Sequence, residues 1–365
     1  MPKLFAALLF AGMLPFIAGC RSAEAASSGE VKFRRFFCWG VPNTEANARK
    51  YAEAGVTDIE VKNRKQFDLA RKYGMTPYWK CFTPAGPYPQ VVTPEEEKYF
   101  AYISGRDLDP KMPKAERMKI LHRRRIEKQH RYGGEQVVEV DTQSKPIPCF
   151  VSDDGLRLTR EKLDKLMKDA PEGVAGMFLD FIGYTNHHGC FCEKCLAKYR
   201  KFLAGKKLAD TPESKKLFYR EKLVDYYNAV ITYIKGKHPA WKIALHIYPD
   251  FRDDHLYGNR IKADYCHQTV AWYFKWEEPK IRKYTKSVIG HAKDFYPHAE
   301  GIPFLGLSTD ESSSLGYKTP ADVERELKII LSAGGRTLSV CSGSAIIEPG
   351  YHEVFRKYCG KASPR

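Results

Sequence analysis

TPADVERELKIILSAGGRTLSVCSG, residues 319–343, contains one complete helix-to-strand unit. Residues 319–335 are amphipathic and begin with a capping Thr319, which predicts a helix. Residues 336–343 form a short apolar run, which predicts a strand. A helix that feeds directly into a strand is the repeating unit of α/β proteins. The question is then how often this unit recurs along the chain.

The same alternation recurs back to residue 33. Residues 44–55 predict a helix that Thr44 caps and Gly55 ends; further helices are predicted at 65–74, 158–170 and 214–239, and from Cys192 onward. A polar stretch rich in proline and charge, about 88–148, is interpreted as an insertion after the third strand. The predicted strands are 36–40, 57–61, 76–82, 174–182, 242–250, 263–274, 301–309 and 336–343.

Eight strands that alternate mostly with helices favour an α/β fold of the (β/α)8 barrel type. A doubly wound open sheet is the alternative, but no glycine-rich phosphate turn follows the first strand. The fold matters for function because the active sites of such barrels lie at the C-terminal ends of the strands.

The first twenty residues, MPKLFAALLFAGMLPFIAGC, indicate an export signal. Their apolar stretch is short for a membrane-spanning helix. Residues 17–20 resemble the bacterial lipobox, in which the cysteine is lipidated. We therefore expect a signal peptide at 1–19, a lipidated Cys20, a flexible tether at 20–32 and a barrel at 33–365. This predicts an exported lipoprotein, anchored to a membrane in the periplasm or at the cell surface.

The chain carries a formal net charge of +16. An exported protein rarely meets nucleic acid, so we expect no nucleic-acid partner. The charge instead suggests a basic surface near an anionic envelope or an acidic polymer. The densest basic run, 117–131, has apolar residues at helical spacing and predicts an exposed helix. The sequence makes no prediction of oligomeric state.

Strand periodicity identifies side chains that point into the barrel. In GMFLDF, residues 176–181, Met177 and Leu179 suit the helix-facing side, so Asp180 is expected to point inward at the end of the fourth strand. A buried carboxylate is costly unless it is paired or functional. Asp180 is therefore a candidate catalytic residue.

Other strand ends supply further candidates. Glycosidic cleavage needs two carboxyl groups that flank the bond, and the partner predicted for Asp180 is Glu311, with Asp310 as the alternate, after strand seven. Aromatic faces beside polar groups suit a carbohydrate. The predicted sugar contacts are Trp39, Tyr184, Asn186, His246, Asp250 and Trp272.

Cys190, Cys192 and Cys195 form a C-x-C-x-x-C motif at a loop-to-helix junction. Three thiolates within one turn suit tetrahedral zinc, and we expect the zinc to be structural. Cys81, after the third strand, is the predicted fourth ligand, with His187 or His188 as alternatives. Disulfide pairing is the competing interpretation.

Residues 176–203 resemble the strand-four region of bacterial TIM-barrel glycoside hydrolases, with an aspartate at the strand end followed by a C-x-C-x-x-C segment. They are more distantly similar to glycoside hydrolase family 42, whose zinc cluster implies Cys81 as the upstream ligand. That family has an Asn-Glu pair where this chain has Leu179-Asp180, so the acid/base role comes to Asp180 by position only. The resemblance implies a glycosidase but not a β-galactosidase.

The predicted function is the hydrolysis of glycosidic bonds in an oligo- or polysaccharide. One alternative is a barrel that binds carbohydrate without cleaving it. The other is a zinc-dependent hydrolase that uses His187, His188, His246 or His267 at an open metal site. The first strand, FFCWG, lacks the H-x-H signature expected of metal-dependent amidohydrolase barrels.

Overall fold

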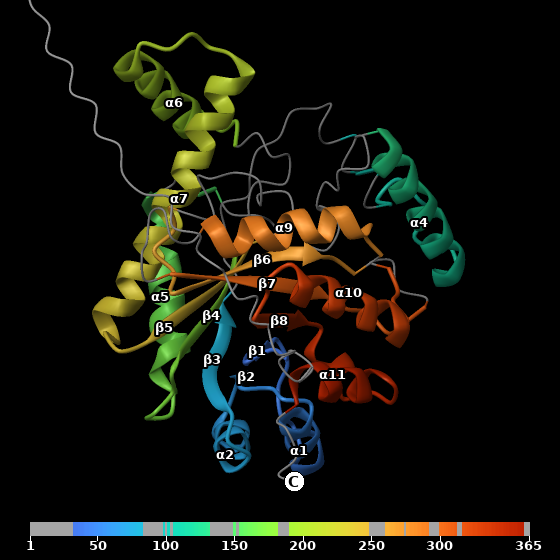
Figure 1. Ribbon diagram of the computed structural model, residues 1–365. Helices are drawn as coiled ribbons and strands as arrows, with labels where there is room; N and C mark the ends of the chain where they lie inside the picture. The colour runs from blue at the N-terminus through green and yellow to red at the C-terminus, as the bar shows by residue number, and fades with distance from the viewer. Residues whose placement is uncertain are drawn as a thin grey trace, which may run out of the picture. The chain divides into compact units, whose positions relative to one another are not determined.

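Eight parallel strands pair in sequence order and close on themselves, with β8 beside β1 (Figure 1). This confirms the (β/α)8 barrel. The computed structural model describes residues 32–82, 98, 101–102, 105–131, 149–150, 153–181, 190–247, 260–273, 275–291, 299–311 and 316–360. The strands are β1 Arg35–Cys38, β2 Asp58–Val61, β3 Thr76–Phe82, β4 Gly176–Phe181, β5 Lys242–Ile247, β6 Tyr265–Ala271, β7 Glu300–Gly306 and β8 Thr337–Cys341.

Helices pack against the outside of the barrel; α9, for example, lies against β6 and β7 (Figure 1). No helix in the described ranges combines the length and apolarity that crossing a bilayer requires. The helices are α1 Glu45–Glu53, α2 Arg64–Lys72, α4 Lys114–Arg131, α5 Asp153–Lys168, α6 Glu193–Lys206, α7 Pro212–Lys237, α9 Glu278–His291, α10 Pro320–Ser332 and α11 Tyr351–Cys359, with a short 3-10 helix, η3, at Gly343–Ile347.

The helix ends follow the local sequence signals. The Thr44 side chain accepts a hydrogen bond from the backbone N–H of Asn47 at 3.2 Å, so it caps α1 as predicted. Gly55 follows α1 with a φ of 88°, and a Cβ there would lie 2.1 Å from the carbonyl oxygen of Cys359. Thr319 and Asp322 form a reciprocal capping box at the start of α10.

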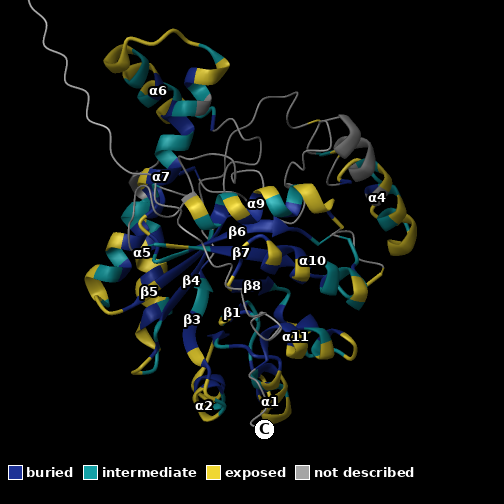
Figure 2. Cartoon of the chain, viewed as in Figure 1, coloured by how far each residue is buried: buried dark blue, intermediate teal, exposed yellow. Residues whose placement is uncertain are grey.

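The strands of the barrel are mostly buried (Figure 2). Their apolar side chains belong to two separate clusters. The larger one lies between the strands and the helices. The smaller one fills the inside of the barrel and contains Phe37, Tyr78, Phe178, Ala244 and Ile302. Most strand members of the larger, outer cluster face the helices; Phe304, on the same face of β7 as Ile302, instead reaches His246. Because strand side chains alternate, a residue beside a helix-facing member of the outer cluster points inward.

The lower part of the barrel interior holds an ion pair. Arg35 of β1 donates to Asp58 of β2, with Nη2 2.6 Å from Oδ1 and Nε 2.9 Å from Oδ2. The guanidinium also lies over the rings of Phe37 and Tyr265, 4.4 Å from each centroid. Asp58 is therefore engaged in holding the barrel together, and the chemistry of the mouth falls to residues further along the strands.

Candidate active site and cysteine cluster

Asp180 points into the barrel near the C-terminal end of β4. Its strand neighbours Leu179 and Met177 belong to the outer cluster, while Phe178 belongs to the inner one. The Asp180 side chain is 20% exposed, and its Oδ1 lies 3.1 Å from Nδ1 of His246. The position predicted for Asp180 from strand periodicity is the one that the structure shows.

His246 lies beside Asp180 because the β4–β5 register pairs these two residues. Its ring is buried and stacks on Phe304, with centroids 3.8 Å apart and planes 17° from parallel. The ring nitrogen Nε2 lies 3.4 Å from Oγ1 of Thr269. Trp272, just after β6, lies parallel to the imidazole at 6.0 Å. The imidazole is thus held by aromatic packing with one nitrogen at the carboxylate.

Trp39 follows β1 and reaches across the barrel interior. Its indole N–H donates to Oγ of Ser339 at 2.9 Å and lies 3.3 Å from Nδ1 of His267. The indole stacks on Phe178, with centroids 4.6 Å apart, and meets the ring of His246 edge-on at 5.6 Å. Trp39 and Trp272 therefore both lie beside His246, and their contact with a sugar stays a prediction.

His267 lies deeper in the barrel and is fully buried. Burial lowers the pKa of His267 well below its usual value, and the nearby His246 and Arg35 lower it further. Its Nε2 atom has no hydrogen-bond partner among the described residues. His267 is thus a neutral imidazole of the barrel interior.

Glu60 of β2 is a second inward carboxylate, which the sequence analysis did not select. Its strand neighbours Ile59 and Val61 belong to the outer cluster, so Glu60 faces inward with Asp58. Only 6% of its surface is exposed. The alternation of acidic and apolar residues in TDIEV contained the signal for this position.

Tyr273 and Cys341 meet at the ends of β6 and β8. The phenol oxygen lies 3.2 Å from the sulfur of Cys341. Burial raises the pKa of Cys341 to about 11, and the carboxylates of Asp180 and Glu60 add to this rise while the contact with Tyr273 opposes it. The Cys341 thiol is therefore neutral at physiological pH.

For the remaining predicted residues, the structure gives either an exposed position or no description. Asp310 and Glu311 follow β7 and are both exposed, and their pairing with Asp180 stays a prediction. Six predicted positions lie outside the described residues: Cys20, Tyr184, Asn186, His187, His188 and Asp250.

Four cysteines form a cluster beside the barrel. Their sulfur atoms all lie within 4.8 Å of one another, and the donor set is compatible with zinc. Three of them, Cys190, Cys192 and Cys195, are the predicted motif. The fourth is Cys149, so the prediction of Cys81 in this place was wrong: Cys81 lies in β3 and packs against the inner cluster of the barrel.

The cluster joins separate parts of the chain. Cys149 comes after the stretch interpreted as an insertion, and the other three cysteines lie at and just before the start of α6. The sulfurs of Cys149 and Cys195 are 3.2 Å apart, longer than the roughly 2.05 Å of a disulfide. Tyr219 of α7 donates to the carbonyl oxygen of Cys190. The cluster therefore brings Cys149 to the start of α6, and the backbone of Cys190 connects it to α7.

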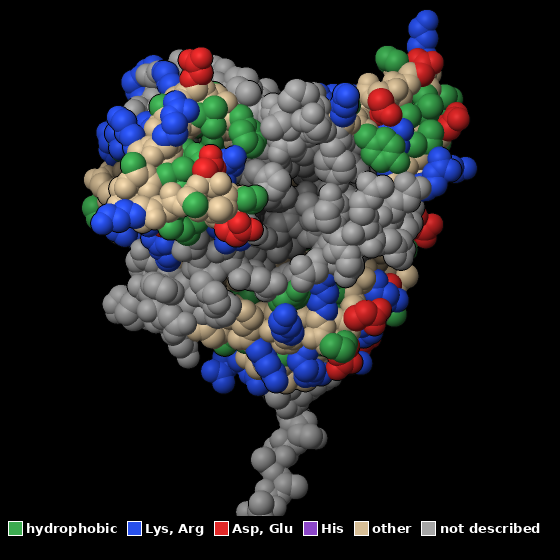
Figure 3. All heavy atoms as spheres, turned by 90° about the horizontal axis from the view of Figure 1, so that it is seen from above, with side chains coloured by type: hydrophobic (Ala, Val, Ile, Leu, Met, Phe, Trp, Pro, Cys, Tyr) green, Lys and Arg blue, Asp and Glu red, His purple; other side chains and the backbone are tan. Residues whose placement is uncertain are grey.

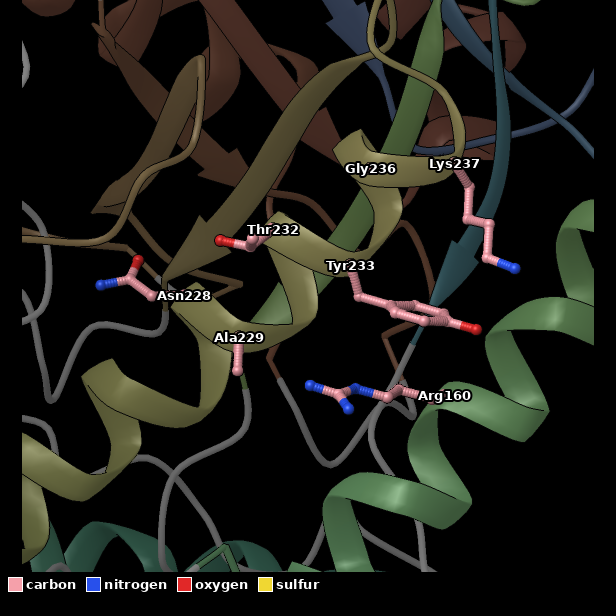
Figure 4. A pocket seen from close by; sticks show the side chains of 7 residues that line it. All are labelled: Arg160, Asn228, Ala229, Thr232, Tyr233, Gly236 and Lys237. Atoms are coloured by element: carbon pink, nitrogen blue, oxygen red, sulfur yellow. The ribbon is translucent and has the colours of Figure 1, made fainter.

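A cavity of about 580 Å³ lies between α5 and α7, on the helical layer (Figure 4). Arg160 comes from α5, and the other lining residues come from α7. Tyr233 in its wall donates to Asp164 at 2.7 Å. None of the predicted site residues lines this cavity.

Lys and Arg side chains are spread over the described parts of the face seen from above, in keeping with the net charge of +16 (Figure 3).

No family model and no curated protein sequence matches this chain. Among solved structures, it is similar to the glycoside hydrolase domain of PgaB (BpsB) from Bordetella bronchiseptica, with 10% identity and a TM-score of 0.55 over 91% of this chain and 100% of that one. It is also similar to alpha-L-fucosidase isoenzyme 2 from Paenibacillus thiaminolyticus, with 13% identity and a TM-score of 0.51 over 90% of this chain and 49% of that one.

A third similar structure is Gan42B, a GH42 beta-galactosidase from G. stearothermophilus studied as a catalytic mutant. It shares 9% identity with a TM-score of 0.50, over 92% of this chain and 58% of that one. The chain thus spans about half the length of the latter two relatives. At these identities the likeness establishes the barrel fold, and these three neighbours are all glycoside hydrolases by description.

Proposed function

We propose that this protein hydrolyses glycosidic bonds in an oligo- or polysaccharide, with Asp180 as a catalytic carboxylate. The observation that carries the proposal is the placement of Asp180: inward, partly exposed, at the C-terminal end of β4 and 3.1 Å from His246. This is the end of the barrel at which enzymes of this fold hold their reacting groups. The glycoside hydrolase neighbours support the proposal at the level of the fold.

The chemistry needs a carboxyl group that can give or take a proton beside the glycosidic oxygen. The 20% exposed fraction of Asp180 leaves its carboxyl group accessible to a sugar. His246 orients this carboxyl group, because its own ring is fixed by stacking on Phe304. Trp39 is half-buried and supplies a ring face on which a pyranose packs. Trp272 is buried beside His246 and stays a predicted contact, as do the polar residues Tyr184, Asn186 and Asp250.

A second carboxyl group is required for either stereochemical outcome. The sequence assigns it to Glu311, with Asp310 as the alternate. Both side chains are exposed beyond the end of β7. Their approach to Asp180 is tested by the Glu311→Gln and Asp310→Asn variants alongside those described below.

The cysteine cluster is proposed to hold one structural zinc ion through Cys149, Cys190, Cys192 and Cys195. Four thiolates fill a tetrahedral shell at about 2.3 Å and leave no open position for water. Three of the cysteines are buried and the fourth is half-buried. When bound, the ion would supply a cross-link between Cys149 and the cysteines at the start of α6.

The alternative of a zinc-dependent hydrolase has less support. Within the described part of the chain, the metal-ligating side chains that lie close enough together to bind an ion are four cysteines, with no histidine among them.

Export and lipidation at Cys20 are also proposed, on the evidence of the N-terminal sequence. Labelling with a radioactive fatty acid, compared between the parent chain and Cys20→Ser, tests that part independently.

The proposed hydrolysis is tested with the Asp180→Asn variant and the full parent chain. Both are assayed on a panel of α- and β-linked nitrophenyl glycosides and on neutral, amino and acidic polysaccharides. Asp68→Asn on the surface of α2 is the matched control, since it makes the same substitution at an exposed ion pair. Turnover in the parent and control that is lost in Asp180→Asn supports the proposal. A parent that binds a glycan of the panel but cleaves none supports the carbohydrate-binding alternative.

A further inference from the structure

Strand β2 places the carboxylate of Glu60 in the barrel interior. Glu60 lies nearer the C-terminal end of the barrel than the Arg35–Asp58 ion pair. Asp58 and Glu60 lie on the same inner face, and Asp58 is held by Arg35. Glu60 is two residues nearer the C-terminal end of the strand, where reacting groups lie in this fold. Among the described strand residues, Glu60 and Asp180 are the inward carboxylates in the upper half of the barrel.

The Glu60 carboxylate is held by two donors. The backbone N–H of Cys81 donates to its Oε1 at 2.9 Å, and Nζ of Lys62 lies 3.5 Å from the same oxygen. A buried carboxylate is costly without such partners. Since Oε1 makes both contacts, Oε2 is available to a water molecule or a substrate.

Glu60 and Asp180 face the same part of the barrel interior. Strands β2 and β4 are separated by β3 alone, which places their backbones about 10 Å apart at roughly 4.8 Å for each strand step. The thiol of Cys341 on β8 experiences the charge of both carboxylates. Inverting glycosidases keep their two carboxyl groups about 6.5–9.5 Å apart to admit a water molecule, a spacing that fits two inward side chains on these strands.

We infer that Glu60, in place of the exposed Glu311 or Asp310 that the sequence suggested, is the second reacting carboxylate and acts as the base of an inverting hydrolysis in which Asp180 is the acid. The inference rests on the proposed function. Glu60 takes a proton from a water molecule as the water oxygen bonds to the anomeric carbon. The bond from that carbon to the glycosidic oxygen breaks, and this oxygen takes the proton of Asp180. Exchange with solvent then restores both carboxyl groups.

The test is Glu60→Gln, measured on the glycoside or polysaccharide that the parent cleaves. Glutamine keeps an oxygen that accepts from Cys81 but loses the base, so kcat is expected to fall about 10²- to 10⁴-fold with KM within about threefold. Glu300→Gln is the matched control: Glu300 starts β7 at the opposite end of the barrel, where it accepts from Thr337 at 2.5 Å. The first product anomer, followed by proton NMR in the parent, is expected to be inverted.

Several outcomes overturn the inference. An inactive Asp180→Asn with an active Glu60→Gln leaves the proposed function standing and removes Glu60 from it, as does a retained anomer. A parent that cleaves nothing removes both. If circular dichroism shows that Glu60→Gln does not fold, Glu60→Asp is used, which keeps the charge and withdraws it by one methylene; a loss of kcat of at least tenfold supports Glu60 as the base, and parental kcat contradicts it.

Discussion

Nδ1 of His246 lies 3.1 Å from Oδ1 of Asp180, although the two residues are 66 positions apart in the chain. The parallel register of β4 and β5 places them opposite each other. The imidazole is 5% exposed and the carboxylate 20% exposed. The carboxylate therefore faces the mouth, with the imidazole behind it as its fixed support.

His246→Phe is expected to lower kcat/KM about 2- to 13-fold, since a hydrogen bond contributes about 0.5–1.5 kcal/mol. Phenylalanine keeps the stacking on Phe304 but removes the nitrogen that meets Asp180. His238→Phe, which keeps a stack on Trp241 at the end of α7, is the control. Steady-state kinetics compares the three proteins; equal kcat/KM in His246→Phe and the parent contradicts the orienting role.

Cys149→Ser is expected to lose the bound zinc and to unfold at a lower temperature than the parent, because a structural zinc site contributes directly to folding. Cys81→Ser is expected to keep one zinc ion per chain. Mass spectrometry of the metal content and thermal unfolding followed by circular dichroism measure both effects. The converse pattern, with zinc retained by Cys149→Ser and lost from Cys81→Ser, returns the fourth ligand to Cys81.

Folding stability is expected to fall below pH 6.5 in part because of His267. Burial holds the pKa of His267 in the folded protein well below that of the unfolded chain, about 6.5. As the pH falls, the unfolded chain takes up a proton that the folded protein does not, so unfolding becomes more favourable.

His267→Gln removes this contribution and keeps a side chain that can bond to Ser339. Urea unfolding at pH 7.5 and pH 5.5 measures it. The loss of stability between these pH values is expected to be about 1.4 kcal/mol smaller in His267→Gln than in the parent. Identical losses in the two proteins would show that His267 is protonated equally in both states.

Lys318 and Glu326 form an ion pair with no exposed surface on either side chain, and Nζ of Lys318 lies 2.7 Å from Oε2 of Glu326. Lys318 also donates to the carbonyl oxygen of Gly306 at the end of β7. Burial lowers the pKa of Lys318, and Glu326 opposes that effect.

Lys318→Met removes the direct partner of the buried Glu326 carboxylate and leaves it only the more distant Arg325, whose Nη2 lies 3.8 Å from Oε1. We therefore expect a loss of up to about 3–5 kcal/mol in the free energy of unfolding. The double variant Lys318→Met/Glu326→Leu is expected to recover most of that loss, since an apolar pair of similar volume replaces both charges. Denaturant unfolding of the two variants and the parent checks this. A double variant as unstable as Lys318→Met indicates that packing rather than charge causes the loss.

Local patterns were sufficient for the barrel. The strand predicted at 76–82 is β3, Thr76–Phe82, and the other predicted strands differ from the observed ones mainly at their ends. A strand or a helix can be recognised from the spacing of apolar residues within a short window of sequence, so the alternation of the two was predictable. Strand ends depend on turns, so the sixth strand, predicted at 263–274, ends at Ala271, before Trp272.

Individual site residues were predictable only where a local sequence pattern, such as strand alternation, indicated the direction of the side chain. Asp180 and His246 follow from strand alternation, and Glu60 was accessible to the same argument. Cys149 was not, because no spacing rule links it to a motif that begins 41 residues later. Cys81 was favoured because β3 neighbours β4, but its side chain points into the barrel, whereas the cysteine cluster lies beside it.

The hydrogen bond from Trp39, after β1, to Ser339 of β8 has a consequence for folding during synthesis at the ribosome. A nascent chain that has emerged only through β7 contains Asp180, His246 and Glu60, yet its first strand lacks a partner and its indole lacks an acceptor. The mouth is therefore completed only once β8 has been translated. Catalytic competence is expected to appear only in chains synthesised through β8.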